Sequence, residues 1–170
     1  MTVALETDVA SKMSLNMKAS SVIAAVAGIE DPVSQQEDTE IAAKRIESIL
    51  IDLDLIYIET HESEIPWLKI FTKTPKKEFS ECTSDEKALI WKTLDIIEKL
   101  MLEYYRPEKI NIASFGNMLP HVHWHIMARF KEDSYFPEPM WGPKQRDASL
   151  ILPAYGKFIE LLQERLQTLK

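Results

Sequence analysis

Three histidines spaced two residues apart are the feature of this sequence that most directly suggests chemistry. His121, His123 and His125 lie within His-Val-His-Trp-His-Ile-Met-Ala-Arg at 121–129, and the chain contains only one other histidine. Alternate side chains of a β-strand share a face, so the three imidazoles would line one face with Met127 while the intervening apolar residues enter the core. A row of imidazoles, each able to donate and accept hydrogen bonds, suits an extended anionic group such as a phosphate chain.

A metal site is an alternative interpretation of the same pattern, because imidazole is a common metal ligand. A strand rises ~3.3 Å per residue, which places the outer two histidines roughly 13 Å apart, whereas Zn–N bonds measure only ~2.0–2.1 Å. A two-histidine site would need another ligand, and the loop candidates are His61, Glu62, Glu132 and Asp133. The sequence therefore favours a site without a protein-bound metal.

Composition narrows the classes of partner. The 170 residues include 20 basic and 27 acidic side chains, a net charge of −7, which argues against non-specific binding to nucleic acid or to anionic membranes. The single cysteine, Cys82, excludes an intramolecular disulfide and is expected to be an ordinary thiol. No apolar stretch reaches the ~20 residues of a membrane helix. We therefore expect a cytoplasmic protein that binds neither nucleic acid nor membrane.

The chain is expected to fold as one domain over residues 37–170, preceded by an N-terminal extension at residues 1–36. An apolar run at 21–28 makes a poor secretory signal, because it barely reaches the minimum length and acidic residues precede it where such a signal is basic. The polar, proline-bearing segment 29–38 marks the loop between the two parts.

Apolar patterning predicts the elements that position the histidines. The first two expected strands are separated by a polar turn and form a hairpin, and the last two pair antiparallel across the turn at Gly116-Asn117. The expected strands are 53–60, 66–73, 110–115 and 121–130. Three amphipathic helices accompany them, at 39–50, 85–105 and 155–169. Thr83 and Glu86 have the spacing of a capping box at the start of the long helix. The fold class is α+β.

The histidine segment resembles the signature of the histidine triad (HIT) superfamily, in which three histidines alternate with apolar residues. Pro66-Trp67, Asn111, Gly116-Asn117 and Met140-Trp141-Gly142 resemble a bacterial subgroup related to diadenosine tetraphosphate hydrolases. The resemblance covers residues 50–145. It implies a HIT-like fold with about five antiparallel strands, one long helix and a C-terminal helix, often in a homodimer that shares the sheet.

Members of this family are nucleotide hydrolases and transferases, so the resemblance also implies catalytic roles. His123 matches the histidine that attacks the α-phosphorus and forms a covalent nucleotidyl-histidine. His121 and His125 would bind phosphate oxygens, orient the nucleophile or assist the leaving group. An imidazole of ordinary pKa, ~6.5, is mostly neutral near pH 7 and keeps a lone pair for attack. No cofactor is required, although a divalent cation can accompany the nucleotide.

The expected substrate-binding residues are carried over in the same way. Gly116 and Asn117 match residues beside the phosphate, and Asn111 matches an asparagine of the pocket. Glu62 stands where relatives carry an aspartate that holds the ribose, with His61 before it. Each of these side chains also has an ordinary interpretation without a binding role. Asn117 would then be a turn residue and Asn111 a strand-edge residue, and Glu62 and His61 would be surface turn residues.

Two departures from the family pattern, Glu62 and Met118, keep other functions open. Met118 replaces a serine found beside the phosphate in many relatives. Trp67 stands where some relatives have another histidine and is interpreted as a core residue. The leading hypothesis is an enzyme that cleaves a dinucleoside polyphosphate or a nucleoside phosphoramidate through His123. The alternatives are a weakly catalytic nucleotide-binding regulator and a two-histidine metal-binding protein.

A proline-rich loop follows the histidine strand. It contains Pro137, Pro139 and Pro143 around Trp141-Gly142. The aromatic residues of this loop would either pack over the histidine site or close the core, and the sequence leaves both open.

Overall fold

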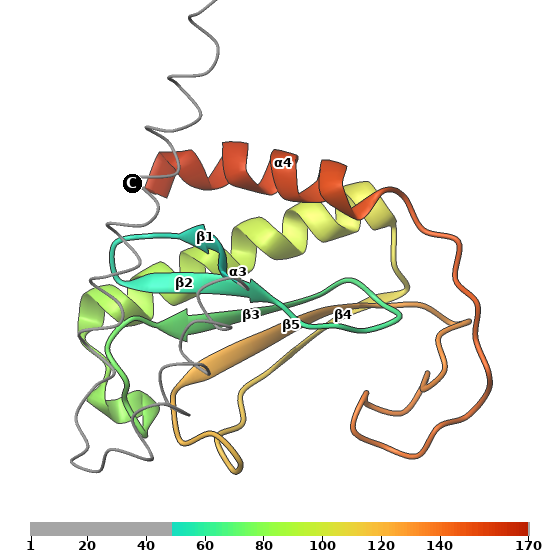
Figure 1. Cartoon of the computed structure of the whole chain (residues 1–170), viewed down its shortest axis with the longest axis horizontal. Helices are drawn as coiled ribbons and strands as arrows, with labels where there is room; N and C mark the ends of the chain where they lie inside the picture. Colours follow the sequence, from blue (N-terminus) through green and yellow to red (C-terminus); the bar gives the residue numbers. More distant parts are fainter. Residues whose placement is uncertain (1–48, 170) are drawn as a thin grey trace, which may run out of the picture. The chain divides into compact units, whose positions relative to one another are not determined.

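The computed structural model describes residues 49–169, which fold as a five-stranded antiparallel sheet with two helices (Figure 1). The N-terminal extension and positions 39–48 of the first predicted helix lie outside the described residues. The strands are β1 (Ile49–Asp52), β2 (Ile56–Thr60), β3 (Trp67–Thr72), β4 (Lys109–Ala113) and β5 (His123–Arg129). The helical segments are η1 (Phe79–Glu81), α3 (Ser84–Tyr105), α4 (Tyr155–Leu166) and η2 (Gln167–Leu169).

The sheet has the strand order β1-β2-β3-β5-β4, and every neighbouring pair is antiparallel. Both predicted hairpins are confirmed, since β2 pairs with β3 and β4 pairs with β5. The strand that carries the histidines lies between β3 and β4, so its backbone is hydrogen-bonded on both sides. This placement holds the histidine side chains on a rigid part of the sheet.

The prediction that the first helix extends to residue 50 is wrong, because residues 49 and 50 belong to β1. Ile49 lies opposite Glu59 and Ile51 opposite Ile58 in the ladder between β1 and β2. Ile-Leu-Ile is rich in β-branched residues, and pairing with an existing strand outweighs a helical apolar spacing that is ambiguous at this length.

The long helix α3 begins and ends with the signals that the sequence predicts. The Thr83 hydroxyl accepts from the Glu86 amide at 3.1 Å, and the Glu86 carboxylate accepts from the Thr83 amide at 2.7 Å, which confirms the capping box. The helix ends at Arg106, whose φ of 51° is left-handed, and Pro107 follows.

Both helices cover the same face of the sheet (Figure 1), and the main core lies between them and the strands. Ile126 and Ala128 of β5 are fully buried there, together with Phe158 of α4. Ile126 and Phe158 each contribute about 1.5–3 kcal/mol by burial. The histidines of β5 lie on the opposite face, as alternation along the strand predicts.

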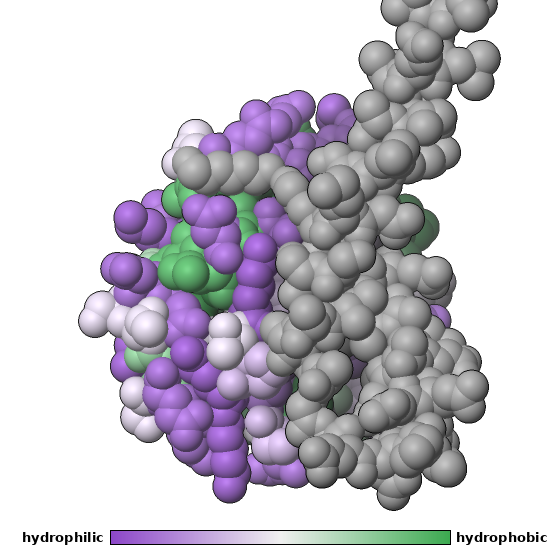
Figure 2. Space-filling model, turned by 60° about the vertical axis from the view of Figure 1, so that its left-hand side comes forward, coloured by the Kyte–Doolittle hydropathy of each residue, from purple (hydrophilic) through white to green (hydrophobic). Residues whose placement is uncertain are grey.

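Figure 2 shows a mainly hydrophilic surface on the described part, interrupted by a compact hydrophobic patch. None of the helices within residues 49–169 combines the length and the apolar character needed to cross a membrane. The amphipathic α4, for example, buries only one side and exposes charged residues on the other.

Candidate functional site

The histidine strand begins two residues later than predicted. β5 starts at His123, while His121 lies in a bend whose amide donates to the carbonyl of Leu119 at 2.7 Å. The next amide, of Val122, donates to the carbonyl of Lys76 at 2.7 Å. Since these two amides are used outside the sheet, and the pairing with β3 stops at His123, His121 cannot continue the ladder.

His123 is buried, with 8% of its surface exposed, and its ring stacks on Phe71 with the centroids 4.8 Å apart. Its Nδ1 lies 2.7 Å from the carbonyl oxygen of His121. A carbonyl oxygen only accepts hydrogen bonds, so Nδ1 carries the proton. In the neutral ring the lone pair is therefore on Nε2, the nitrogen more distant from the backbone.

His121 is attached to the end of β3 through its ring. Its Nε2 lies 3.0 Å from the Thr72 hydroxyl and 2.9 Å from the Thr72 carbonyl oxygen. The Thr72 hydroxyl uses its own hydrogen to donate to the carbonyl of Thr74 at 3.0 Å, so both Thr72 oxygens accept from His121 Nε2–H. The ring of His121 is thus held by β3, and its backbone carbonyl orients His123.

His125 receives a hydrogen bond from the Trp67 indole, whose Nε1–H donates to His125 Nδ1 at 3.0 Å. Because Nδ1 accepts, the proton of the neutral ring is on Nε2. Burial first, and then the nearby His123, His61 and Lys69, lower the pKa of His125 to about 4. His125 therefore remains neutral near pH 7 and presents Nε2–H as a hydrogen-bond donor.

The fourth histidine lies beside the other three. The ring of His61 is 4.0 Å from that of Trp67 and 6.3 Å from that of His125. Burial and then the charge of Lys69 lower the pKa of His61, and Glu62 opposes them. Glu62 itself is exposed, and it lines a cavity of about 350 Å³ together with His61 and Trp67. The predicted ribose-side residues therefore meet at one end of the histidine row.

A second cavity, of about 330 Å³, lies at the other end of the row. Gly116, Asn117 and His121 line it together with Lys77 and Ser114. The Ser114 hydroxyl donates to the backbone carbonyl of His123 at 2.8 Å. The structure thus places the predicted phosphate-side residues next to the histidines.

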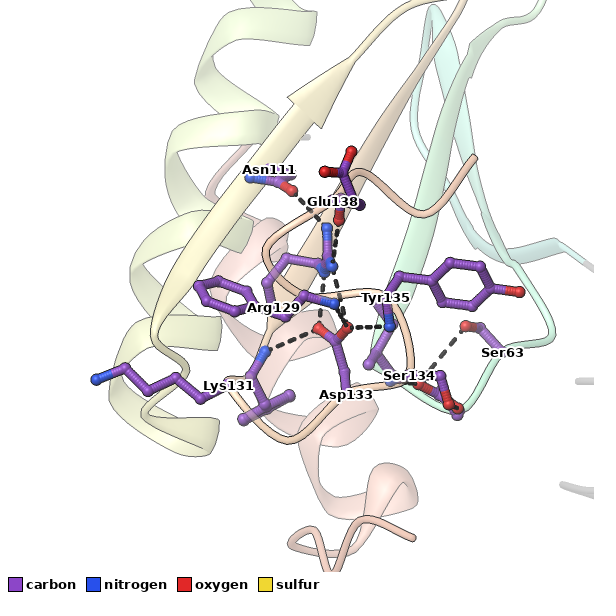
Figure 3. A network of polar contacts seen from close by, with 12 residues as sticks. Ser63, Asn111, Arg129, Lys131, Asp133, Ser134, Tyr135 and Glu138 are labelled. Carbon is purple, nitrogen blue, oxygen red and sulfur yellow. Dashed lines mark hydrogen bonds and ion pairs between the residues drawn. The ribbon is translucent and has the colours of Figure 1, made fainter. Parts of the chain in front are cut away.

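The remaining predicted binding residue, Asn111, lines neither of these two cavities and instead belongs to a buried ion-pair network (Figure 3). Its Oδ1 accepts from Arg129 Nη1 at 2.9 Å. The Arg129 guanidinium also donates to both carboxylate oxygens of Asp133, at 2.8 and 3.0 Å. Burial raises the pKa of Asp133, but the hydrogen bonds from Arg129 and from three backbone amides outweigh it and lower the pKa. Asn111 acts here as a support for Arg129.

The same network bears on the metal alternative. Asp133, one of its candidate ligands, is fully buried and uses its oxygens on Arg129 and backbone amides. Across residues 49–169 no group of three His, Cys, Asp or Glu side chains is placed to hold a metal ion.

Three contributors to the site were missed or assigned differently from the sequence. Trp67 is buried, as a core residue should be, but its indole N–H also sets the tautomer of His125. Ser114 and Phe115, which both line the second cavity, were not singled out at all. The hydrogen bond of Trp67 could have been suspected from the sequence, because some relatives have a histidine at this position and histidine also forms hydrogen bonds. Nothing in the local pattern around Ser114 indicates its partner.

Comparisons of the sequence and of the fold with known proteins point to one family. The sequence model of the HIT domain family matches residues 47–132. No protein of curated function matches the chain. Among solved structures, a histidine triad protein from Bradyrhizobium japonicum is 25% identical with a TM-score of 0.58, covering 72% of this chain and 93% of that one. A histidine triad protein from Sinorhizobium meliloti is 23% identical with a TM-score of 0.55, covering 74% and 93%. One from Marinobacter aquaeolei is 22% identical with a TM-score of 0.54, covering 71% and 86%.

Proposed function

This chain belongs to the HIT domain family, and from that premise we propose that it is a nucleotide hydrolase or nucleotidyltransferase acting through a covalent nucleotidyl-histidine on His123. Its substrates would be dinucleoside polyphosphates or nucleoside phosphoramidates. The family membership supports a nucleotide-binding function of the hydrolase type, and the geometry of the histidines supports the finer assignment.

The observation that carries the proposal is the hydrogen bond of 2.7 Å between His123 Nδ1 and the His121 carbonyl. It fixes the tautomer in which Nε2 has the lone pair, so the ring is a nucleophile without a separate base. When Nε2 bonds to phosphorus the ring becomes an imidazolium, and the carbonyl then accepts from a more acidic Nδ1–H. The hydrogen bond therefore strengthens as the intermediate forms.

In the proposed first step His123 Nε2 attacks the α-phosphorus, and the bond from phosphorus to the leaving oxygen or nitrogen breaks. The leaving group keeps the electron pair and takes a proton from solvent, because His125 is neutral and its Nε2–H acts as a hydrogen-bond donor to phosphate oxygens. In the second step the oxygen of water, or of another acceptor in a transferase, bonds to phosphorus and the bond to Nε2 breaks. The electron pair of that bond returns to Nε2, and the acceptor's proton passes to solvent. Both steps depend on position and local charge.

The two cavities at the ends of the histidine row would hold the rest of the nucleotide. Asn117 and the backbone at Gly116 would bind phosphate oxygens in the cavity that they line together with Lys77. At the other end Glu62 and His61 would bind the ribose hydroxyls. No protein cofactor is part of the proposal, and a divalent cation would enter only with the phosphates.

The proposed partner, besides the nucleotide, is a second copy of the chain. β4 is the last strand of the sheet, and among the described strands only β5 pairs with it. An open edge of this kind allows the sheet to continue across a homodimer.

The proposal is tested by trapping the intermediate. The full chain is incubated with diadenosine tetraphosphate, and acid-labile adducts are mapped by mass spectrometry of peptides prepared without acid. We expect an added AMP on the peptide that contains His123, at that residue. Nucleotide binding with neither an adduct nor turnover would instead assign the chain to the regulatory alternative.

Trp67→Phe should lower kcat by about 10- to 100-fold, the order expected when a side chain that orients a functional group is lost. Phenylalanine keeps a ring but removes the N–H that holds His125 in its Nε2–H tautomer. Because this N–H also opposes protonation of Nδ1, its loss should raise the pKa of His125 above about 4. Steady-state kinetics measured over a range of pH would then show that kcat begins to fall on the acid side at a higher pH in the variant than in the unmodified protein.

A matched control is Trp91→Phe, which changes an exposed tryptophan of α3. It should leave both kcat and the pH profile unchanged. Nitrogen NMR of the His125 ring gives a second measurement, since the two tautomers have distinct shifts. An unchanged tautomer and pH profile in Trp67→Phe would refute the positioning role of Trp67.

A further inference from the structure

Two half-exposed aromatic side chains lie against the histidine site although neither belongs to a strand or helix. Phe115 follows β4 and is 48% exposed, and Trp141 in the proline-rich loop is 50% exposed. Their ring centroids are 4.7 Å apart, and they lie 6.3 and 5.2 Å from the ring of His125. Trp141 also contacts Trp67, with the centroids 5.2 Å apart. The loop therefore packs its aromatic residue over the site.

The buried network of Figure 3 holds this loop in place. Arg129 Nη2 donates to the carbonyl of Glu138 at 2.8 Å, three residues before Trp141. The Gly142 amide then closes a turn on the carbonyl of Pro139 at 2.8 Å. A Cβ at position 142 would lie 3.1 Å from that same carbonyl oxygen, so a side chain there would require the turn to shift by a few tenths of an ångström. Trp141 is thus positioned over the site by backbone contacts at both of its sides.

A second exposed tryptophan shows that this placement is specific to the loop. Trp91 is 51% exposed, close to the value for Trp141, but its ring contacts Phe79 and Trp124 on the helical side of the sheet. Of the two, only Trp141 touches a histidine of the triad. Open aromatic surface next to a reactive group offers a stacking partner for planar rings, and such stacking tolerates any base.

We infer that Phe115 and Trp141 form a stacking subsite for a planar aromatic ring of the substrate. The inference rests on the proposed function, because it assumes a nucleotide at His123. In such a substrate the planar ring would be either the base of the transferred nucleotide or an aromatic group in the leaving portion. Either ring could stack on the exposed parts of Phe115 and Trp141, which lie beside His125.

The first arm of the test measures binding of the base. Calorimetry compares AMP with ribose 5-phosphate, which lacks only the base, on the full chain and on Trp141→Ala. If the subsite holds the base, the unmodified protein prefers AMP, and the variant loses about tenfold of that preference, the effect of about 1.4 kcal/mol of stacking. Phe115→Ala should act in the same direction, and Trp141→Phe should retain most of the preference.

The second arm measures the leaving portion. It compares kcat/KM for diadenosine tetraphosphate and adenosine 5′-tetraphosphate, which differ in the second adenosine. If the subsite holds that adenosine, Trp141→Ala lowers the ratio of the two values by about tenfold. Trp91→Ala, which removes an equally exposed tryptophan, should change neither ratio.

The outcomes separate the subsite from the proposed function. If Trp141→Ala changes neither ratio, or if the unmodified protein shows no preference in either arm, the subsite is overturned even when an adduct forms on His123. A loss of the AMP preference in Trp141→Ala supports the subsite even when no adduct and no turnover are found. Thermal melting shows whether each variant is folded, and Phe115→Ala repeats the test if Trp141→Ala is not.

Discussion

Replacing His123 with alanine should abolish nucleotide turnover, with a fall in kcat of about 10³-fold or more, because no other group can form the phosphorus–nitrogen bond in its place. The covalent adduct should disappear with the activity. His121 and His125 use ring nitrogens on Thr72 and Trp67, and neither is oriented as His123 is. If the alanine variant had the same kcat as the unmodified protein, His123 would be excluded as the nucleophile.

The same substitution should leave the chain folded at a measurable cost. His123 is buried against Phe71, so alanine leaves a small void, and we expect the free energy of unfolding to fall by about 1–3 kcal/mol. Urea denaturation of both proteins measures the difference. His123→Asn, which keeps a planar polar group, is the companion variant: it should be equally inactive but more stable than the alanine variant.

Asp133→Ala should be the most destabilising single change among the polar residues of the site. Arg129 and Asp133 are both fully buried, and removal of the carboxylate leaves a guanidinium in the interior with its main partner gone. Breaking a buried pair in this way costs about 3–5 kcal/mol. Three backbone amides also lose their acceptor. Chemical denaturation should therefore show a large fall in the midpoint.

Asp147→Ala is the matched control for that measurement. Asp147 forms an ion pair with Lys144 at 2.7 Å, but the carboxylate is fully exposed, so its removal should leave the midpoint unchanged within error. A similar small effect of Asp133→Ala would show that the network of Figure 3 does not stabilise the loop.

The pH dependence of the free energy of unfolding should also show the contribution of the Asp133 carboxylate. The folded-state pKa of Asp133 lies below its ordinary value, so the carboxylate stabilises the fold above the unfolded pKa of about 4. That contribution is lost as the pH falls from about 4 through the lower pKa of the folded state. Asp133→Asn should therefore flatten the acid side of the stability profile relative to the unmodified protein.

Local rules explain what the sequence predicted well. The capping box at Thr83, the apolar period of α3 and the alternation along β5 each depend on residues a few positions apart. Both hairpins were predicted for the same reason, since each joins two strands that follow one another in the sequence. The end of the first predicted helix was wrong because residues 49–50 are fixed by their pairing with β2, which no local pattern records.

Partners distant in the sequence explain what could not be predicted. Asn111 was expected in the substrate pocket, but its oxygen is taken by Arg129 from the neighbouring strand. Trp67 was expected only to fill the core, yet it hydrogen-bonds to His125, 58 positions away. The start of β5 at His123 depends on where β3 ends, at Thr72.

The sequence by itself determined the fold class, the face of the strand that carries the histidines and their resemblance to a nucleotide-binding family. These follow from spacing and residue type, which are local properties of the chain. Only the tertiary structure decided the chemical state of each imidazole. His121 donates to Thr72, His123 donates to a backbone carbonyl and His125 accepts from Trp67, because the atoms that fix each tautomer belong to other strands or bends brought there by folding.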